Sequence, residues 1–211
     1  MFAGIIEKTG QVLEVISKSG SKRFKIRYAS EEPLQAGESI NLNGACQTVI
    51  QVGKDYFWVE AMQETLQRAN LNSLEVRDEV NLERSLKLSD RISGHLVSGH
   101  IDTIGSVSKV IKNPDSWLLK IKFSSEFCRF VGPKGSVALD GISLTVIEAG
   151  PDHFTVGIIP HTWQNTNLKN LRPGHLANLE FDLLAKYVES ILKQRRKVEK
   201  ITPEFLQLAG W

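Results

Sequence analysis

The chain has 211 residues, of which 41% are hydrophobic, and its formal net charge is +2. This composition is typical of a soluble protein with one or two cores, and it gives no case for nucleic acid or an anionic membrane as a partner. No apolar run is long enough to span a bilayer, and the start MFAGIIEKTG lacks the features of a signal peptide. The two cysteines, Cys46 and Cys128, favour a reducing cytoplasm over a disulfide framework.

The first half of the chain is read as short strands separated by turns. Runs of β-branched and aromatic residues occur at 10–16, 22–28 and 56–62, and Gly, Asn and Asp punctuate them. Residues 38–52 predict a hairpin, because Asn43 and Gly44 lie between two alternating runs and this turn type needs a positive φ at both central residues. Residues 64–70 predict a single helical turn.

The second half repeats the first. When the sequence is shifted by 97 residues, 39–85 lies over 136–182, and 18 of these 47 pairs are identical. Chance would give roughly three. A repeat of this length is the size of a small domain, not of a solenoid unit. We therefore expect a duplicated domain, with boundaries at 1–90 and 91–184, followed by a segment at 185–211 that has no counterpart.

Elements of the second half match those of the first. Strands are expected at 117–123 and 153–159, a second hairpin at Asp140 and Gly141, and a helical turn at 161–167. About six strands in each half, with no strong internal helix, predict an all-β fold of two small closed barrels in tandem.

Residues 182–200 predict a C-terminal helix with Asp182 as its N-cap. The sequence KQRRK at 193–197 is either a basic patch or a solvated last turn, and the second reading suits the helix dipole. An apolar stripe on this helix must be buried, and another subunit is a good candidate to cover it. The stripe consists of Leu184, Tyr187, Val188, Ile191 and Leu192.

Small polar pairs follow both predicted hairpin turns. Strand alternation places Cys46 and Thr48 on one face of the first hairpin, and Ser143 and Thr145 on the same face of the second. The pairs are chemically unequal, because a thiol ionises near neutral pH far more easily than a hydroxyl. The alternative is that Cys46 is a small core residue.

The segment SGHLVSGH at 93–100 holds His95 and His100. If it were a strand, the two rings would face opposite ways, and no further ligands occur at zinc spacing, so a metal site is not expected. His100 replaces Ile5 in the repeat, and Asp182 replaces Ser85, so the second half has gained titratable groups. No dinucleotide or phosphate-loop motif occurs. These patterns predict two unequal pockets without naming their ligand.

Seven motifs in order also resemble one family. MFAGIIE, NGACQTV, VNLERSL, GHLVSGH, DGISLTV, IIPHT and NLEFDLLAKYVE together look like the riboflavin synthase of bacteria and plants, from residue 1 to about residue 192. The resemblance implies two homologous six-stranded Greek-key barrels and a C-terminal helix that joins three chains. It further implies dismutation of two 6,7-dimethyl-8-ribityllumazine molecules to riboflavin and 5-amino-6-ribitylaminouracil, by transfer of a four-carbon unit, with no metal or organic cofactor. Where the family usually has Leu between Cys and Thr, this chain has Gln47.

The resemblance assigns roles residue by residue. It implies catalytic roles for Cys46, His100, Ser143 and Asp182. Cys46 would act from the first barrel, and Ser143 and His100 would act from the second. It implies ligand contacts for Phe2, Gly4, Ser39, Thr48, His95 and Thr145. It also suggests a homotrimer, lumazine synthase as a candidate partner, and a cytoplasmic location, or the plastid stroma if a transit peptide has been removed. The alternative within the same fold is a non-catalytic lumazine or flavin carrier.

Overall fold

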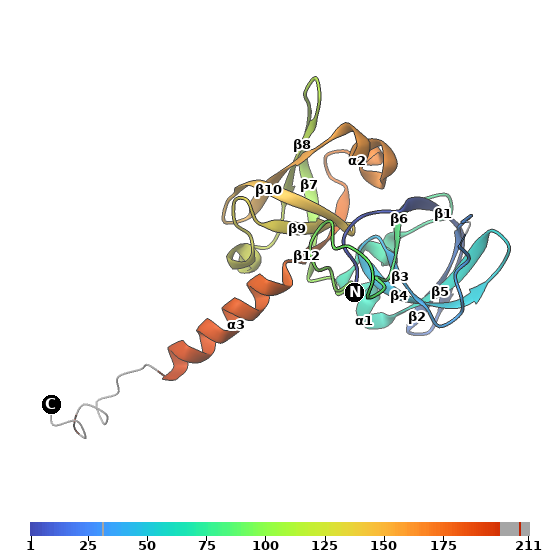
Figure 1. Cartoon of the computed structure of the whole chain (residues 1–211), viewed down its shortest axis with the longest axis horizontal. Helices are drawn as coiled ribbons and strands as arrows, with labels where there is room; N and C mark the ends of the chain where they lie inside the picture. Colours follow the sequence, from blue (N-terminus) through green and yellow to red (C-terminus); the bar gives the residue numbers. More distant parts are fainter. Residues whose placement is uncertain (31, 199–206, 208–211) are drawn as a thin grey trace.

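The computed structural model describes residues 1–30, 32–198 and 207, with side chains described as far as residue 193 and at 207. Twelve strands in these residues close into two barrels of six antiparallel strands, which lie side by side (Figure 1). Both barrels are Greek keys with the same strand order, since the second strand of each pairs with the fifth and not with the third. The predicted all-β fold of two tandem barrels is confirmed.

The first barrel has the strand order β1-β2-β5-β4-β3-β6. A helical turn, which the sequence predicts at residues 64–70, connects β5 to β6 together with a 3-10 turn that follows it. The elements are β1 (Lys8–Lys18), β2 (Ser21–Arg27), β3 (Ser39–Leu42), β4 (Ala45–Val52), β5 (Tyr56–Met62), α1 (Gln63–Arg68), η1 (Asn70–Ser73) and β6 (Glu79–Arg84).

The second barrel repeats this order as β7-β8-β11-β10-β9-β12. It adds one 3-10 turn, η2, which packs against the C-terminal helix α3. The elements are β7 (Thr103–Lys112), β8 (Trp117–Lys122), η2 (Ser125–Phe130), β9 (Ser136–Leu139), β10 (Ile142–Ala149), β11 (His153–Ile158), α2 (Pro160–Asn165), η3 (Asn167–Asn170), β12 (Leu176–Phe181) and α3 (Leu183–Val198).

Both hairpin predictions are confirmed by the backbone. Asn43 and Gly44 have φ values of 48° and 87°, and Asp140 and Gly141 have 45° and 82°. These are the two positive values that a tight hairpin turn requires. Beyond each turn, residues alternate between the barrel interior and its outer face, and large apolar side chains such as Phe24, Phe57 and Phe154 fill the two interiors. Each such buried side chain contributes roughly 2 kcal/mol to stability.

The N-terminal segment crosses from the first half to the second. Phe2 forms a two-residue antiparallel bridge with Val97, in which each backbone N–H donates to the other's carbonyl. The Phe2 ring is fully buried and packs with Val97 and Ala138 beside Cys46. Residues 93–100 form this bridge within an irregular segment, so the strand alternation assumed for His95 and His100 does not apply.

A buried polar network joins the two barrels. Equivalent residues of the two halves make equivalent bonds in it. Asn81 Nδ2 donates to Asn167 Oδ1 at 2.9 Å, and Asn178 Nδ2 donates to Asn70 Oδ1 at the same distance. Hydrogen bonds that satisfy buried amides fix the geometry of an interface, because an unpaired amide would be costly. The network's six side chains are Asn43, Asn70, Asn81, Asp140, Asn167 and Asn178.

The helix α3 projects away from both barrels (Figure 1). Asp182 Oδ1 accepts from the Leu184 N–H at 2.9 Å, which confirms the predicted N-cap. Ion pairs from Lys186 to Asp102 and from Glu189 to Arg129 hold the start of the helix against the second barrel. Its apolar stripe, residues 184–192, is exposed, and the end of the predicted helix at 199–200 lies outside the described residues. None of the helices within 1–30 and 32–198 combines the length and apolarity needed to cross a membrane.

Candidate functional site

The first pocket lies beside the hairpin of the first barrel. Cys46 and His100 line the same cavity of about 450 Å³, together with Thr65 of α1 and Phe127 of η2. The Cys46 N–H donates to the Gly99 carbonyl at 2.8 Å, so the residue before His100 is bonded directly to the residue that carries the thiol. The half-buried thiol and the exposed imidazole therefore share one cavity.

The resemblance groups His100 with Ser143 as residues that act from the second barrel. Within one chain, the structure places His100 in the cavity that Cys46 lines. The physical reason is the crossing of residues 93–100 over the barrel boundary, where they pair with the N-terminal segment. Position in the sequence placed His100 in the second half, whereas the backbone path places it in the first pocket.

Ser143 of β10 occupies the equivalent place in the second barrel, and the residues around it are called the second pocket for this correspondence. The Ser143 N–H donates to the Gly4 carbonyl at 2.8 Å, which is the counterpart of the bond between Cys46 and Gly99. Ser143 Oγ lies 2.7 Å from His95 Nδ1. The other ring nitrogen of His95, Nε2, is buried and has no hydrogen-bond partner among the described residues.

The electrostatics of the second pocket favour a neutral imidazole. Burial lowers the pKa of His95, and the nearby charge of Asp182 opposes this only in part. A neutral ring can take a proton, while its other nitrogen stays bonded to Ser143. The structure thus pairs Ser143 with His95, a residue that the resemblance had assigned to ligand contact, and it keeps Asp182 close enough to influence that ring.

The remaining predicted residues lie around these two centres. Thr48 and Thr145 are exposed on the outer faces of β4 and β10, and Ser39 is the cross-strand neighbour of Thr48. Ser39 lines a different cavity, which also contains Ile5 and Ser93. The structure therefore does not bring Ser39 into the cavity of Cys46 and His100.

Two buried glutamates were missed by the sequence analysis. Glu83 of β6 accepts hydrogen bonds from the backbone of Ala3 and Gly4, and Glu180 of β12 accepts them from Ser98 and Gly99. Burial raises the pKa of Glu83 to about 7, although the backbone N–H groups that it accepts act in the opposite direction. A signal was present, because the sequence Asn-Leu-Glu ends both barrels at equivalent positions and places a charged residue on a buried strand.

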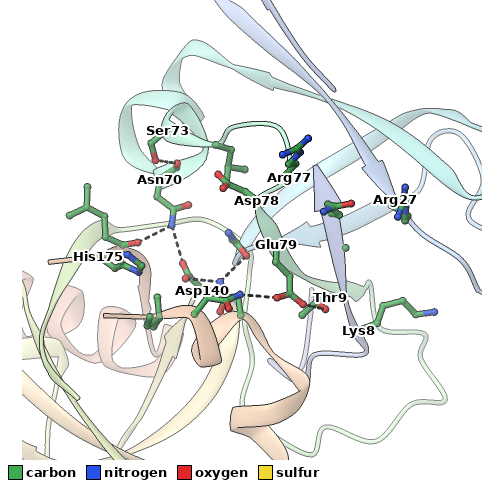
Figure 2. Close-up of a pocket in the computed structure, with 18 of the residues that line it drawn as sticks. Lys8, Thr9, Arg27, Asn70, Ser73, Arg77, Asp78, Glu79, Asp140 and His175 are labelled. Atoms are coloured by element: carbon green, nitrogen blue, oxygen red, sulfur yellow. Dashed lines mark hydrogen bonds between the residues drawn. The ribbon is translucent and has the colours of Figure 1, made fainter. Parts of the chain in front are cut away.

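A larger cavity than that of Cys46 lies elsewhere, at the junction of the barrels (Figure 2). Its volume is about 1030 Å³, and its floor is the buried network around Asn70 and Asp140. Burial raises the pKa of Asp140 to about 6, against the hydrogen bonds that it accepts. None of the ten residues predicted for the site lines this cavity, so its polar groups are assigned to holding the barrels together.

Comparisons with known proteins agree with this description. The family model described as "Lumazine binding domain" matches residues 3–85 and 98–182, which are the two barrels. Riboflavin synthase of Actinobacillus pleuropneumoniae is 37% identical over 216 residues, covering all of both chains. Riboflavin synthase of Mycobacterium tuberculosis (strain H37Rv) is 38% identical over 198 residues, covering 92% of this chain and 98% of that one.

Solved structures share the fold at lower identity. LumP complexed with riboflavin superposes with a TM-score of 0.81 at 20% identity, over 86% of this chain and 99% of that chain. LumP complexed with 6,7-dimethyl-8-(1'-D-ribityl) lumazine superposes with a TM-score of 0.78 at 21% identity, again over 86% of this chain and 99% of that chain. Two tandem barrels that both match the lumazine-binding domain, each with a polar residue at its hairpin, define a duplicated lumazine-binding protein. The chain belongs to the riboflavin synthase family.

Proposed function

We propose that this protein converts two molecules of 6,7-dimethyl-8-ribityllumazine into riboflavin and 5-amino-6-ribitylaminouracil. One molecule donates a four-carbon unit and the other accepts it. The observation that carries the proposal is the pair of similar but unequal polar sites that follow the two hairpin turns. Each is built on a glycine carbonyl from the opposite half, but one presents Cys46 with His100 and the other Ser143 with His95.

The reaction requires such an inequality. Two copies of one substrate must take different roles, and a proton must leave the 7-methyl group of one of them. A thiol is a candidate nucleophile or base in the first pocket, and a neutral His95 paired with Ser143 is a candidate base in the second. Holding two substrates in near contact can itself lower a barrier by several kcal/mol.

The direct test is turnover by the pure protein in the presence of a chelator. Incubation with 6,7-dimethyl-8-ribityllumazine should yield riboflavin and 5-amino-6-ribitylaminouracil in equal amounts, measured by chromatography. A requirement for added metal contradicts the proposal. So does tight binding of the lumazine without any product.

The second outcome would favour a carrier. LumP has the same fold, and its structures contain riboflavin or the dimethyl ribityllumazine. A carrier needs pockets that hold the ligand but has no need of two different polar pairs. The unequal pairs of this chain support the enzyme over the carrier.

We further propose that the protein is a homotrimer joined by α3. The exposed stripe of the helix includes Tyr187 and Val188, which are 61% and 57% exposed. Deleting the chain from Tyr187 onward should leave folded barrels that bind ligand but run as monomers in light scattering. A truncated chain that remains trimeric contradicts this role. Lumazine synthase as a partner and the cytoplasm as the compartment stay predictions.

In this trimer each working site would combine the first pocket of one chain with the second pocket of its neighbour. Because His100 shares the cavity of Cys46, the informative pair of inactive variants is Cys46→Ala and Ser143→Ala. When the two are unfolded and refolded together, sites that combine their intact pockets should restore activity well above the sum of the parents. Mixed trimers, identified by mass spectrometry, that stay inactive would contradict a site between chains.

A further inference from the structure

The carboxylate of Glu180 is buried and holds one loop of the first pocket. Only 1% of its surface is exposed. Oε1 accepts from the Ser98 N–H at 2.6 Å and from the Ser98 hydroxyl at 2.7 Å, and Oε2 accepts from the Gly99 N–H at 2.9 Å. Gly99 then presents its carbonyl to the Cys46 N–H. A chain of hydrogen bonds thus leads from β12 of the second barrel to the cysteine of the first.

Glu83 of the first barrel makes the equivalent chain of hydrogen bonds to the second barrel. It is 4% exposed, and its carboxylate accepts from the Ala3 N–H at 2.7 Å and from the Gly4 N–H at 3.1 Å. The Gly4 carbonyl accepts from the Ser143 N–H. A glutamate of the first barrel is therefore linked to the serine of the second.

The two glycines can make these links only because they lack a side chain. Gly4 and Gly99 have φ values of 73° and 84°, a region that L residues rarely adopt. A Cβ on Gly99 would lie 2.5 Å from the Cβ of Cys46, and one on Gly4 would lie 2.7 Å from the Cβ of Ser143. The loop at Gly99 thus lies directly against Cys46, and the loop at Gly4 lies directly against Ser143.

The burial of the two carboxyl groups needs an explanation. Within the described residues neither Glu83 nor Glu180 forms an ion pair, and most of their partners are backbone N–H groups of the two loops. Burying a carboxylate is costly unless its hydrogen bonds are strong and well placed. A carboxylate can accept two N–H groups at once through separate oxygens, which a glutamine could not reproduce.

We propose that Glu180 and Glu83 are positioning residues that act across the barrel boundary. Glu180 sets the position of Cys46 in the first pocket, and Glu83 sets that of Ser143 in the second. The inference rests on the proposed function for its catalytic meaning, but its structural content can be measured without turnover.

The test uses the reactivity of the Cys46 thiol. In a Cys128→Ser background Cys46 is the only cysteine, so its alkylation by iodoacetamide can be followed directly. Losing charge-assisted hydrogen bonds should raise the population of the detached loop, and we expect Glu180→Gln to accelerate alkylation about tenfold. Glu83→Gln is the matched control. The rate should stay within about twofold of the parent, because the loop that Glu83 holds contacts Ser143 and its one bond toward Cys46, from the neighbouring Asn41 amide, is long at 3.4 Å.

The comparison separates positioning from general loosening. If Glu180→Gln leaves the rate unchanged, or if both variants accelerate it equally at equal melting temperature, the proposal is overturned. Should Glu180→Gln not fold, Ser98→Ala removes the hydroxyl that donates to the same carboxylate and that accepts from the His100 N–H at 3.2 Å, and it should give a smaller acceleration, about threefold. No acceleration by Ser98→Ala then contradicts the proposal.

The reciprocal measurement concerns His95, which is bonded to Ser143. Glu83→Gln should shift the imidazole resonances of His95 in nitrogen-correlated NMR spectra, and Glu180→Gln should leave them in place. The opposite pattern contradicts the crossed assignment. Failure of the wild type to make riboflavin would refute the proposed function but would leave these readouts intact.

Discussion

The two pockets differ in their side chains but agree in their backbones. In both, a glycine with positive φ offers its carbonyl to the first polar residue after the opposite hairpin turn, and the two bonds have the same length, 2.8 Å. The first pocket then presents a thiol and an exposed imidazole, whereas the second presents a hydroxyl bonded to a buried imidazole. The two halves have thus kept the same backbone contacts around the hairpin turn, and they differ in the side chains that could act on a ligand there.

The largest expected effect comes from making the two pockets alike. Cys46→Ser gives the first pocket the hydroxyl of the second while keeping nearly the same shape. Ligand binding and folding should be retained, and turnover should fall about a thousandfold, or ~4 kcal/mol, because a hydroxyl is a far weaker nucleophile and base. Cys128→Ser, at an exposed cysteine of η2, is the control and should leave turnover unchanged.

If Cys46→Ser and Cys46→Ala both keep full turnover in steady-state assays, Cys46 is a core residue. The chemical difference between the pockets would then depend on the two histidines. That result would leave the fold and the ligand class untouched.

A second difference lies at the hairpin turns, where Asp140 of the second half replaces Asn43 of the first. Burial raises the pKa of Asp140 from 3.8 to about 6. A raised acid pKa contributes stability that is fully present below 3.8 and is lost as the pH rises through 6. The loss amounts to about 3 kcal/mol.

Asp140→Asn tests this difference by making the turns alike. The free energy of unfolding is measured in urea at about pH 4 and at about pH 7.5. In the wild type it should decrease by about 2 kcal/mol more between these two conditions than in the variant. Glu83 also titrates in this range but is present in both proteins. An equal fall in both would show that folding does not raise the pKa of Asp140, and it would contradict this account.

The smallest effect concerns the barrel interiors. Gln47 is 4% exposed and occupies the place that Leu144, at 7%, holds in the second barrel. Among the described residues, its amide Nε2 donates only to the neighbouring Cys46 carbonyl, at 2.8 Å. Gln47→Leu should stabilise the protein by about 1 kcal/mol in urea unfolding, because it removes a buried amide. The reciprocal Leu144→Gln should destabilise it, and stabilisation by both changes would contradict this reasoning.

Local patterns in the sequence predicted the elements but not the contacts between halves. The two turns at Asn43 and Asp140 and the cap at Asp182 depend on neighbours within a few residues, and the repeat shows when the sequence is aligned with itself, so these features could be read directly. The bond between His95 and Ser143 and the crossing of the N-terminal segment join residues that are far apart in the chain. The spacing of apolar residues does not predict such contacts, because residues 93–100 belong to no helix or strand.

The central claim is that one chain holds two unequal pockets for one kind of ligand. It is tested most directly by equilibrium dialysis with a 7-oxo-8-ribityllumazine, which lacks the 7-methyl group and so cannot lose its proton or transfer carbon. The account predicts that two molecules bind per chain with two different dissociation constants. Binding of a single molecule per chain, or of two with the same constant, would contradict it.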